Sequence, residues 1–106
     1  MPKCVLMAVL GGVLLAFSAA SRGEVNGEEL LDMMNHDASH EAAQFFIDDV
    51  WQRWNDKVFC MPDGDRQRMS FDAVKFYLDS HPEELYRPRR YLIVQGLRSA
   101  FPCDAR

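Results

Sequence analysis

Histidine, cysteine and carboxylate side chains are the groups of this 106-residue chain that could do chemistry. His36 and His40 are four residues apart, the spacing at which two side chains on one helix face can chelate a metal. The segment between them contains residues typical of a helix start, however, and no third or fourth ligand is specified. His81 precedes Pro82, a context typical of a helix end rather than of a general base. We therefore expect no metal site and no cofactor.

The carboxylates show no catalytic arrangement. Nothing in the sequence pairs one as a general acid with a second as base or nucleophile. A serine–histidine–aspartate context and a phosphate-binding glycine loop are not recognisable either. The segment "PDGD" at 62–65 lacks the calcium-loop pattern and is typical of a turn. The sequence therefore predicts a protein that is not an enzyme.

The first twenty residues have the pattern of a secretory signal peptide. Lys3 precedes an apolar run over 5–17, and small residues follow, so cleavage is expected between Ala20 and Ser21. A membrane anchor is the alternative, but the run is shorter than the roughly 20 residues that span a bilayer. We expect the secreted domain to comprise 21–106, with no membrane span after removal of the signal.

The cysteines indicate a disulfide. Cys4 leaves with the expected signal peptide, so Cys60 and Cys103 remain in an oxidising compartment. Two cysteines allow one intramolecular bridge, Cys60 to Cys103, and we expect it to form. A pair of free thiols or an intermolecular bridge are the alternatives. Closing this loop would stabilise the fold by roughly 4 kcal/mol in the chain-entropy model.

Helical patterns fill the rest of the chain and must position these groups. Asn26 is the expected N-cap of a first helix, since Glu29 follows it at capping-box spacing. A long second helix is expected over 37–59, capped by Asp37 or Ser39. Its apolar face is expected in the core, with one tryptophan at an interface as the alternative: Ala43, Phe46, Ile47, Val50, Trp51, Trp54 and Val58.

Shorter helices and breaks are predicted in the second half. A loop is expected over 60–69, after which Ser70 caps a third helix. Pro82 ends this helix and starts a short turn, and a last helix follows with Pro88 at its first position. No alternating run predicts a strand. The expected fold is all-α, a small single-domain bundle of about four main helices with one disulfide.

Charge is distributed unevenly along the chain. The formal net charge is −4, and residues 24–52 contain acidic but no basic side chains. Nucleic acid is not an expected partner, because its binding requires a basic stripe. The acidic tract either keeps helix faces solvated or speeds association with a basic protein partner.

Three segments of the second half, "FCMPDG", "YLDSHPEEL" and "LIVQGLRSAFPC", resemble a known family. Their order is similar to that of the Rap/Tai type VI amidase immunity proteins, and the resemblance covers 27–103. It implies a small, all-helical, periplasmic protein that binds and blocks a peptidoglycan-cleaving amidase effector delivered by neighbouring bacteria. It also allows a homodimer, since members of this family often form dimers.

The resemblance assigns roles to single residues. Cys60 and Cys103 correspond to the family's structural disulfide, and the motif residues are Pro62, His81, Pro82, Glu83, Phe101 and Pro102. Family members commonly carry a further cysteine in each of the first two helices. This chain has Met33 or Met34 and Ala42 or Ala43 there, which is consistent with the loss of a second disulfide as a unit.

An immunity protein blocks its target by occluding a cleft, so it requires a rigid helix or loop rather than chemistry. The candidate contacts are an acidic helix face and the loop after the second helix: Glu41, Asp48, Asp49, Asp63, Asp65 and Arg66. The alternative function is a small periplasmic acid-stress chaperone. Its many carboxylates would be protonated at low pH, which would loosen the domain and expose apolar surface.

Overall fold

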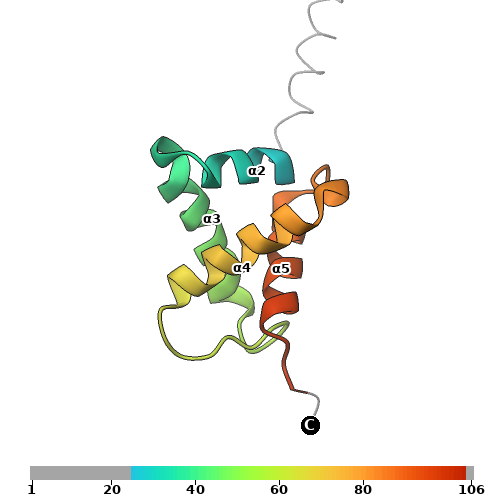
Figure 1. Ribbon diagram of the computed structural model, residues 1–106. Coiled ribbons are helices and arrows are strands. Elements are labelled where there is room, and N and C mark those ends of the chain that lie inside the picture. Colours follow the sequence, from blue (N-terminus) through green and yellow to red (C-terminus); the bar gives the residue numbers. More distant parts are fainter. Residues whose placement is uncertain (1–24, 105–106) are drawn as a thin grey trace, which may run out of the picture.

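Four α-helices make up most of the computed structural model, which describes residues 25–104 (Figure 1). They are α2 (Gly27–Met34), α3 (Asp37–Trp54), α4 (Arg66–Ser80) and α5 (Arg89–Ala100), with the 3-10 turn η1 (Pro82–Glu84) between α4 and α5. No strand occurs in this range, so the predicted all-α class is confirmed. The predicted signal peptide and its cleavage site between Ala20 and Ser21 lie outside the described residues.

One hydrophobic core joins all four helices. In Figure 1, α2 lies across one end of the bundle, while α3 and α5 run down its two sides and α4 lies between them. Buried residues recur at every third or fourth position of each helix, so the pattern that predicted the helices also packs them. The core residues are Leu30, Met34, Ala43, Ile47, Val50, Phe59, Met61, Phe71, Val74, Tyr77, Leu78, Leu92, Ile93 and Leu97.

The start of α2 confirms the predicted cap. The Asn26 side chain accepts the Glu29 backbone N–H at 3.0 Å. The N–H of Gly27 donates to the Arg87 carbonyl at 3.0 Å, and the N–H of Glu28 donates to the Leu85 carbonyl at 3.1 Å. These bonds tie the beginning of α2 to the segment that leads into α5.

The ends of α3 differ from the prediction. His36, not Asp37 or Ser39, holds the N-cap position, and it makes no side-chain capping bond. The helix ends at Trp54 instead of Phe59, because the next residue, Asn55, has an extended backbone with ψ of 139°. Asp56 then adopts φ of 70°, in the left-handed region, which completes the break.

The core prediction for α3 was correct for its first half and wrong at its end. Ala43, Ile47 and Val50 are buried, and Trp51 is half-buried against the core. Trp54 keeps 41% of its surface exposed. The apolar stripe therefore continues past the buried part of the helix and emerges at the surface.

The prediction that Ser70 caps the third helix was wrong. The helix α4 begins at Arg66, and the Asp65 carboxylate caps it by accepting the Arg68 N–H at 3.1 Å. Ser70 is fully buried inside the helix, where its hydroxyl donates to the Gln67 carbonyl at 3.0 Å. That bond satisfies a polar group that would be costly to bury alone.

The prolines beside η1 and α5 behave nearly as predicted. Pro82 opens η1 directly after the C-cap of α4. Pro88 occupies the N-cap of α5 rather than its first helical position, and the helix ends at Ala100, two residues before Pro102. Each proline therefore marks a helix boundary to within one or two residues.

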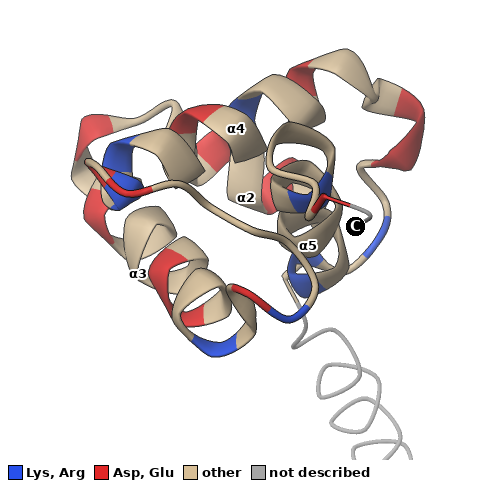
Figure 2. Cartoon of the chain, turned by 90° about the horizontal axis from the view of Figure 1, so that it is seen from below, with Lys and Arg blue, Asp and Glu red and all other residues tan. Residues whose placement is uncertain are grey.

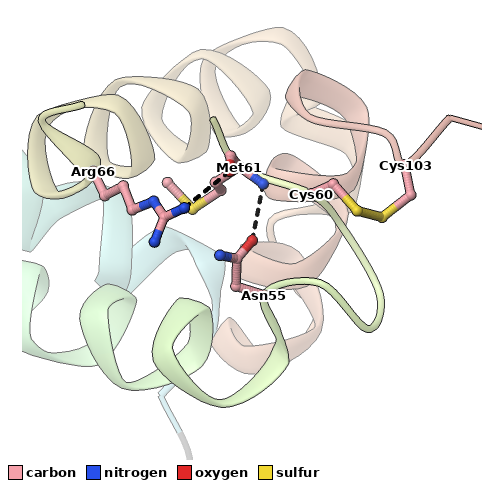
Figure 3. Close-up of a disulfide and its surroundings, with 5 residues drawn as sticks. All are labelled: Asn55, Cys60, Met61, Arg66 and Cys103. Atoms are coloured by element: carbon pink, nitrogen blue, oxygen red, sulfur yellow. Dashed lines mark hydrogen bonds between the residues drawn. A yellow bond between two sulfur atoms is a disulfide. The ribbon is translucent and has the colours of Figure 1, made fainter. Parts of the chain in front are cut away.

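The predicted disulfide between Cys60 and Cys103 is confirmed, with Cα atoms 4.8 Å apart (Figure 3). The Cys60 N–H also donates to the Phe101 carbonyl at 2.8 Å. Because α3 ends early, the bridge joins the loop between α3 and α4, rather than the end of α3, to the segment after α5.

Replacing Gly27 by alanine is expected to lower the free energy of unfolding by about 1–3 kcal/mol, although alanine ordinarily favours a helix. A Cβ atom at this position would lie 2.4 Å from Leu92 Cδ1 and 2.9 Å from the Leu85 carbonyl oxygen. The backbone of Leu85 cannot move aside without breaking its bond to Glu28. Urea denaturation measures the effect, with the exposed neighbour Glu28→Ala as control. A Gly27→Ala variant as stable as the wild type would contradict this packing.

Candidate partner-binding surface

Local packing accounts for the three histidines. His36 Nδ1 lies 2.7 Å from the Asp32 carbonyl oxygen, and the His40 ring packs against Phe71 with centroids 4.3 Å apart. His81 stacks on Tyr77 at 4.0 Å. Within residues 25–104, no three His, Cys, Asp or Glu side chains are grouped so as to hold a metal ion. Over the same residues, no helix has the length and apolar character required to cross a membrane.

The acidic face predicted on α3 is partly occupied by internal bonds. Asp48 accepts hydrogen bonds from Gln44, from the Trp51 indole and from Gln67 of α4, at 2.8–2.9 Å. It therefore connects α3 to α4. Of the other two predicted contacts, Asp49 forms an exposed ion pair with Arg53 at 3.4 Å, and Glu41 lies on the surface.

The predicted contact loop is held rigidly from inside. Arg66 donates to the carbonyl oxygens of Pro62 and Met61 at 3.1 and 3.2 Å and pairs with Asp63 at 3.3 Å. The Met61 N–H donates to the Asn55 side chain at 2.8 Å (Figure 3). The Asp65 carboxylate caps α4. The Asp63 side chain is fully exposed, although it pairs with Arg66.

Exposed aromatic residues mark surfaces that the sequence did not single out, apart from the alternative that a tryptophan of the second helix lies at an interface. They are Phe45, Trp54, Phe76, Tyr86 and Tyr91, each between 40% and 74% exposed. Trp54 and Tyr91 line the same groove, of about 450 Å³, between the end of α3 and the first half of α5. Val58, Pro88, Arg90 and Val94 complete it. We call it the Trp54–Tyr91 groove. Aromatic and arginine side chains are enriched in protein interfaces.

The Trp54–Tyr91 groove has a basic rim on a protein that is acidic overall. Arg90 lines the groove, and the Arg87 guanidinium lies 5.0 Å from the Tyr91 ring centroid. The segment 85–103 contains four arginines and no acidic residue. Figure 2 shows basic segments at the end of α3, in the loop after it and on α5. The molecule therefore presents an acidic face on α2 and α3 and a basic one along α5.

A second groove, of about 500 Å³, lies between α4 and α5. Phe76 and Tyr77 form one wall, and small residues, Ala73 and Gly96 among them, form its floor. Burial and the nearby Glu84 carboxylate, to which the hydroxyl donates at 3.3 Å, raise the pKa of Tyr77. This phenol therefore stays neutral near pH 7, and Asp72 is the carboxylate that lines this otherwise largely apolar groove.

The pKa of His36 is expected to lie above 6.5, because the Asp32 backbone carbonyl and then the Asp32 carboxylate, 3.4 Å away, favour the protonated ring. A raised pKa stabilises the folded state at low pH, and this contribution is lost as the pH rises through the folded value. An NMR titration of the imidazole signals measures it. Asp32→Asn should lower the pKa of His36, whereas a wild-type value at or below 6.5 would contradict the contact.

Comparison with known proteins adds one match. The family model of the Rap1a immunity proteins matches residues 26–103, a range that includes all four helices and both disulfide cysteines. No curated protein and no solved structure matches the chain. The resemblance carried by the sequence motifs is therefore confirmed over nearly the whole described part.

Proposed function

Because this chain belongs to the Rap1a immunity proteins, we propose that it binds a peptidoglycan amidase toxin delivered by type VI secretion and occludes the toxin's active site. The family match over residues 26–103 is the observation that carries the proposal. Neutralisation by occlusion requires a stable surface of the right shape, and it requires no reaction on the immunity protein itself. The role that we propose for this chain is therefore binding and not catalysis.

Rigidity supports this role. The loop between α3 and α4 is fixed by the disulfide at Cys60, by the Asn55 side chain and by Arg66. A surface that is ordered before binding loses less conformational entropy in the complex. Four of the sequence-predicted contacts are exposed, namely Glu41, Asp49, Asp63 and Asp65, and two are half-buried, namely Asp48 and Arg66. All six remain predictions for contact with the toxin.

Location in the periplasm is part of the proposal. A peptidoglycan amidase acts outside the cytoplasm, so its inhibitor must be exported to meet it. The signal-like pattern of residues 1–20 and the Cys60–Cys103 disulfide both favour an oxidising compartment.

A protection assay tests this function. A peptidoglycan amidase effector, sought first among the genes next to this one, is directed to the periplasm of a laboratory bacterium, with or without the full 106-residue chain. We expect lysis without the chain and survival with it. A chain lacking residues 1–20 stays in the cytoplasm and serves as control, because it should not protect. Equal lysis with and without the exported chain would refute the proposed function.

A further inference from the structure

We propose that the Trp54–Tyr91 groove anchors an acidic surface segment of the partner protein that carries apolar side chains. This inference rests on the proposed function for its partner, but it names a contact site that differs from the acidic face of α3 and from the loop before α4. The groove collects two exposed aromatic rings and an arginine, the residue types that dominate binding energy at protein interfaces.

The lining requires apolar groups on the occupant. Trp54 and Tyr91 are 41% and 40% exposed, so each ring is fixed at its base and can still bury much of its area on binding. Val58, Pro88 and Val94 add aliphatic walls. Burying an aromatic ring against such walls removes a large apolar area from water, with little loss of side-chain freedom.

The rim requires negative charge on the occupant. Arg90 is exposed, and within the described residues no carboxylate lies within 4.0 Å of its guanidinium. Arg87 already has one acidic neighbour, because its Nε lies 3.6 Å from a Glu84 carboxylate oxygen. Lys57 is exposed and directly precedes Val58 of the groove. Arg98 is exposed and lines a neighbouring pocket that also includes Val58. Asp56, directly before Lys57, is an acidic residue in the same turn. Carboxylates of a partner would complement this rim and direct its approach.

A second copy of the same chain fits the groove less well. In a two-fold symmetric dimer the same patch lies on both sides of the contact, so the basic rim of one copy would face the basic rim of the other. Two like charges at such a contact are unfavourable. The groove between α4 and α5 is lined by the acidic Asp72 and by no arginine, and nothing in its lining indicates what would cover it.

Four single variants test the anchor in a binding assay with the amidase used in the protection assay, and with protein exported to the periplasm. Trp54→Ala and Arg90→Glu change the groove. Phe45→Ala and Arg68→Glu are matched controls, because Phe45 is an exposed aromatic residue on α3 and Arg68 an exposed arginine on α4. We expect each groove variant to weaken binding by roughly 30-fold or more and each control by less than about 3-fold. Circular dichroism confirms that all four fold.

The opposite pattern would overturn the inference. Unchanged binding by both groove variants, with loss for Glu41→Lys or Phe76→Ala, would place the contact on the acidic face or in the groove between α4 and α5. Sedimentation of the exported protein alone tests whether a second copy of the chain occupies the groove. A dimer that Trp54→Ala dissociates would identify the groove as an interface between copies.

A second probe separates failure of this inference from failure of the proposed function. Two synthetic helical peptides carry leucine and phenylalanine on one face and either glutamate or lysine on the other. The NMR signal of the Trp54 indole N–H reports binding. We expect the glutamate peptide to bind at least about 10-fold more tightly than the lysine peptide. If no amidase binds the wild type, a glutamate preference still supports the groove, whereas equal affinities or no shift overturn it.

Discussion

Replacing Cys60 and Cys103 together by serine is expected to lower the free energy of unfolding by about 4 kcal/mol. The two cysteines are 43 residues apart in sequence, and closing a loop of this length removes roughly that much chain entropy from the unfolded state. Stabilities of small domains are on the order of 5–15 kcal/mol, so the variant would lose a large fraction of its stability. The midpoint of thermal unfolding should fall by on the order of 20 °C.

Guanidinium denaturation of the exported wild type and of the double serine variant measures this difference. The wild type treated with dithiothreitol is the control, and it should unfold at the same denaturant concentration as the serine variant. Cys103 is exposed and Cys60 half-buried, so the change in packing is small beside the change in connectivity. Equal midpoints for the oxidised and reduced proteins would show that the bridge does not stabilise the fold.

Phe59→Ala is expected to lower the free energy of unfolding by about 3–5 kcal/mol, the usual cost of removing a fully buried phenylalanine. Phe59 is 0% exposed and is the largest of the fully buried side chains, although it lies outside every helix. Its carbonyl oxygen accepts the Asp56 N–H at 2.7 Å, and Met61, two residues on, is also buried. The ring therefore fixes the loop that carries Cys60 to the core.

Phe45→Ala is the matched control for this second variant. Phe45 is 69% exposed on α3, so the same chemical change should alter the free energy of unfolding by less than about 0.5 kcal/mol. Urea denaturation of both variants gives the comparison. A Phe59→Ala protein that is as stable as Phe45→Ala would mean that the loop is not part of the core.

Local signals in the sequence were sufficient for the fold class and for most helix positions. The capping pair Asn26 and Glu29, the apolar stripe of α3 and the prolines beside η1 and α5 all act within a few residues of the boundary they set. The disulfide was predictable because two cysteines remain after the expected signal, and they allow one internal pairing.

The start of α4 depends in part on a contact that no local pattern reveals. Ser70 was the predicted N-cap, whereas Asp65, which belongs to an equally favoured residue type, was not considered for that position. The earlier start brings Gln67 to within 2.9 Å of Asp48 on α3 and lets Arg66 reach two loop carbonyls. Of these bonds, the one between Gln67 and Asp48 joins residues 19 apart and could not be predicted from a local pattern, whereas the Arg66 bonds are local.

The Trp54–Tyr91 groove was missed for a related reason. The stripe of α3 continues at helical spacing through Trp54 to Val58, and periodicity alone places such residues in a core. The helix stops at Trp54, where the backbone of Asn55 turns extended, and the Asn55 side chain accepts the Met61 N–H six residues further on. The unusual run of arginines without acidic residues over 85–103 was the signal that could have indicated this surface.

An inhibition titration tests the central claim most directly. The protein purified from the periplasm is added in increasing amounts to a fixed concentration of the amidase used in the protection assay, and the release of cleaved peptidoglycan is measured. Tight occlusion predicts that activity falls linearly and reaches zero near a fixed stoichiometric ratio. Full cleavage in the presence of a large excess of the folded, disulfide-bonded protein would contradict its role as an immunity protein against that amidase.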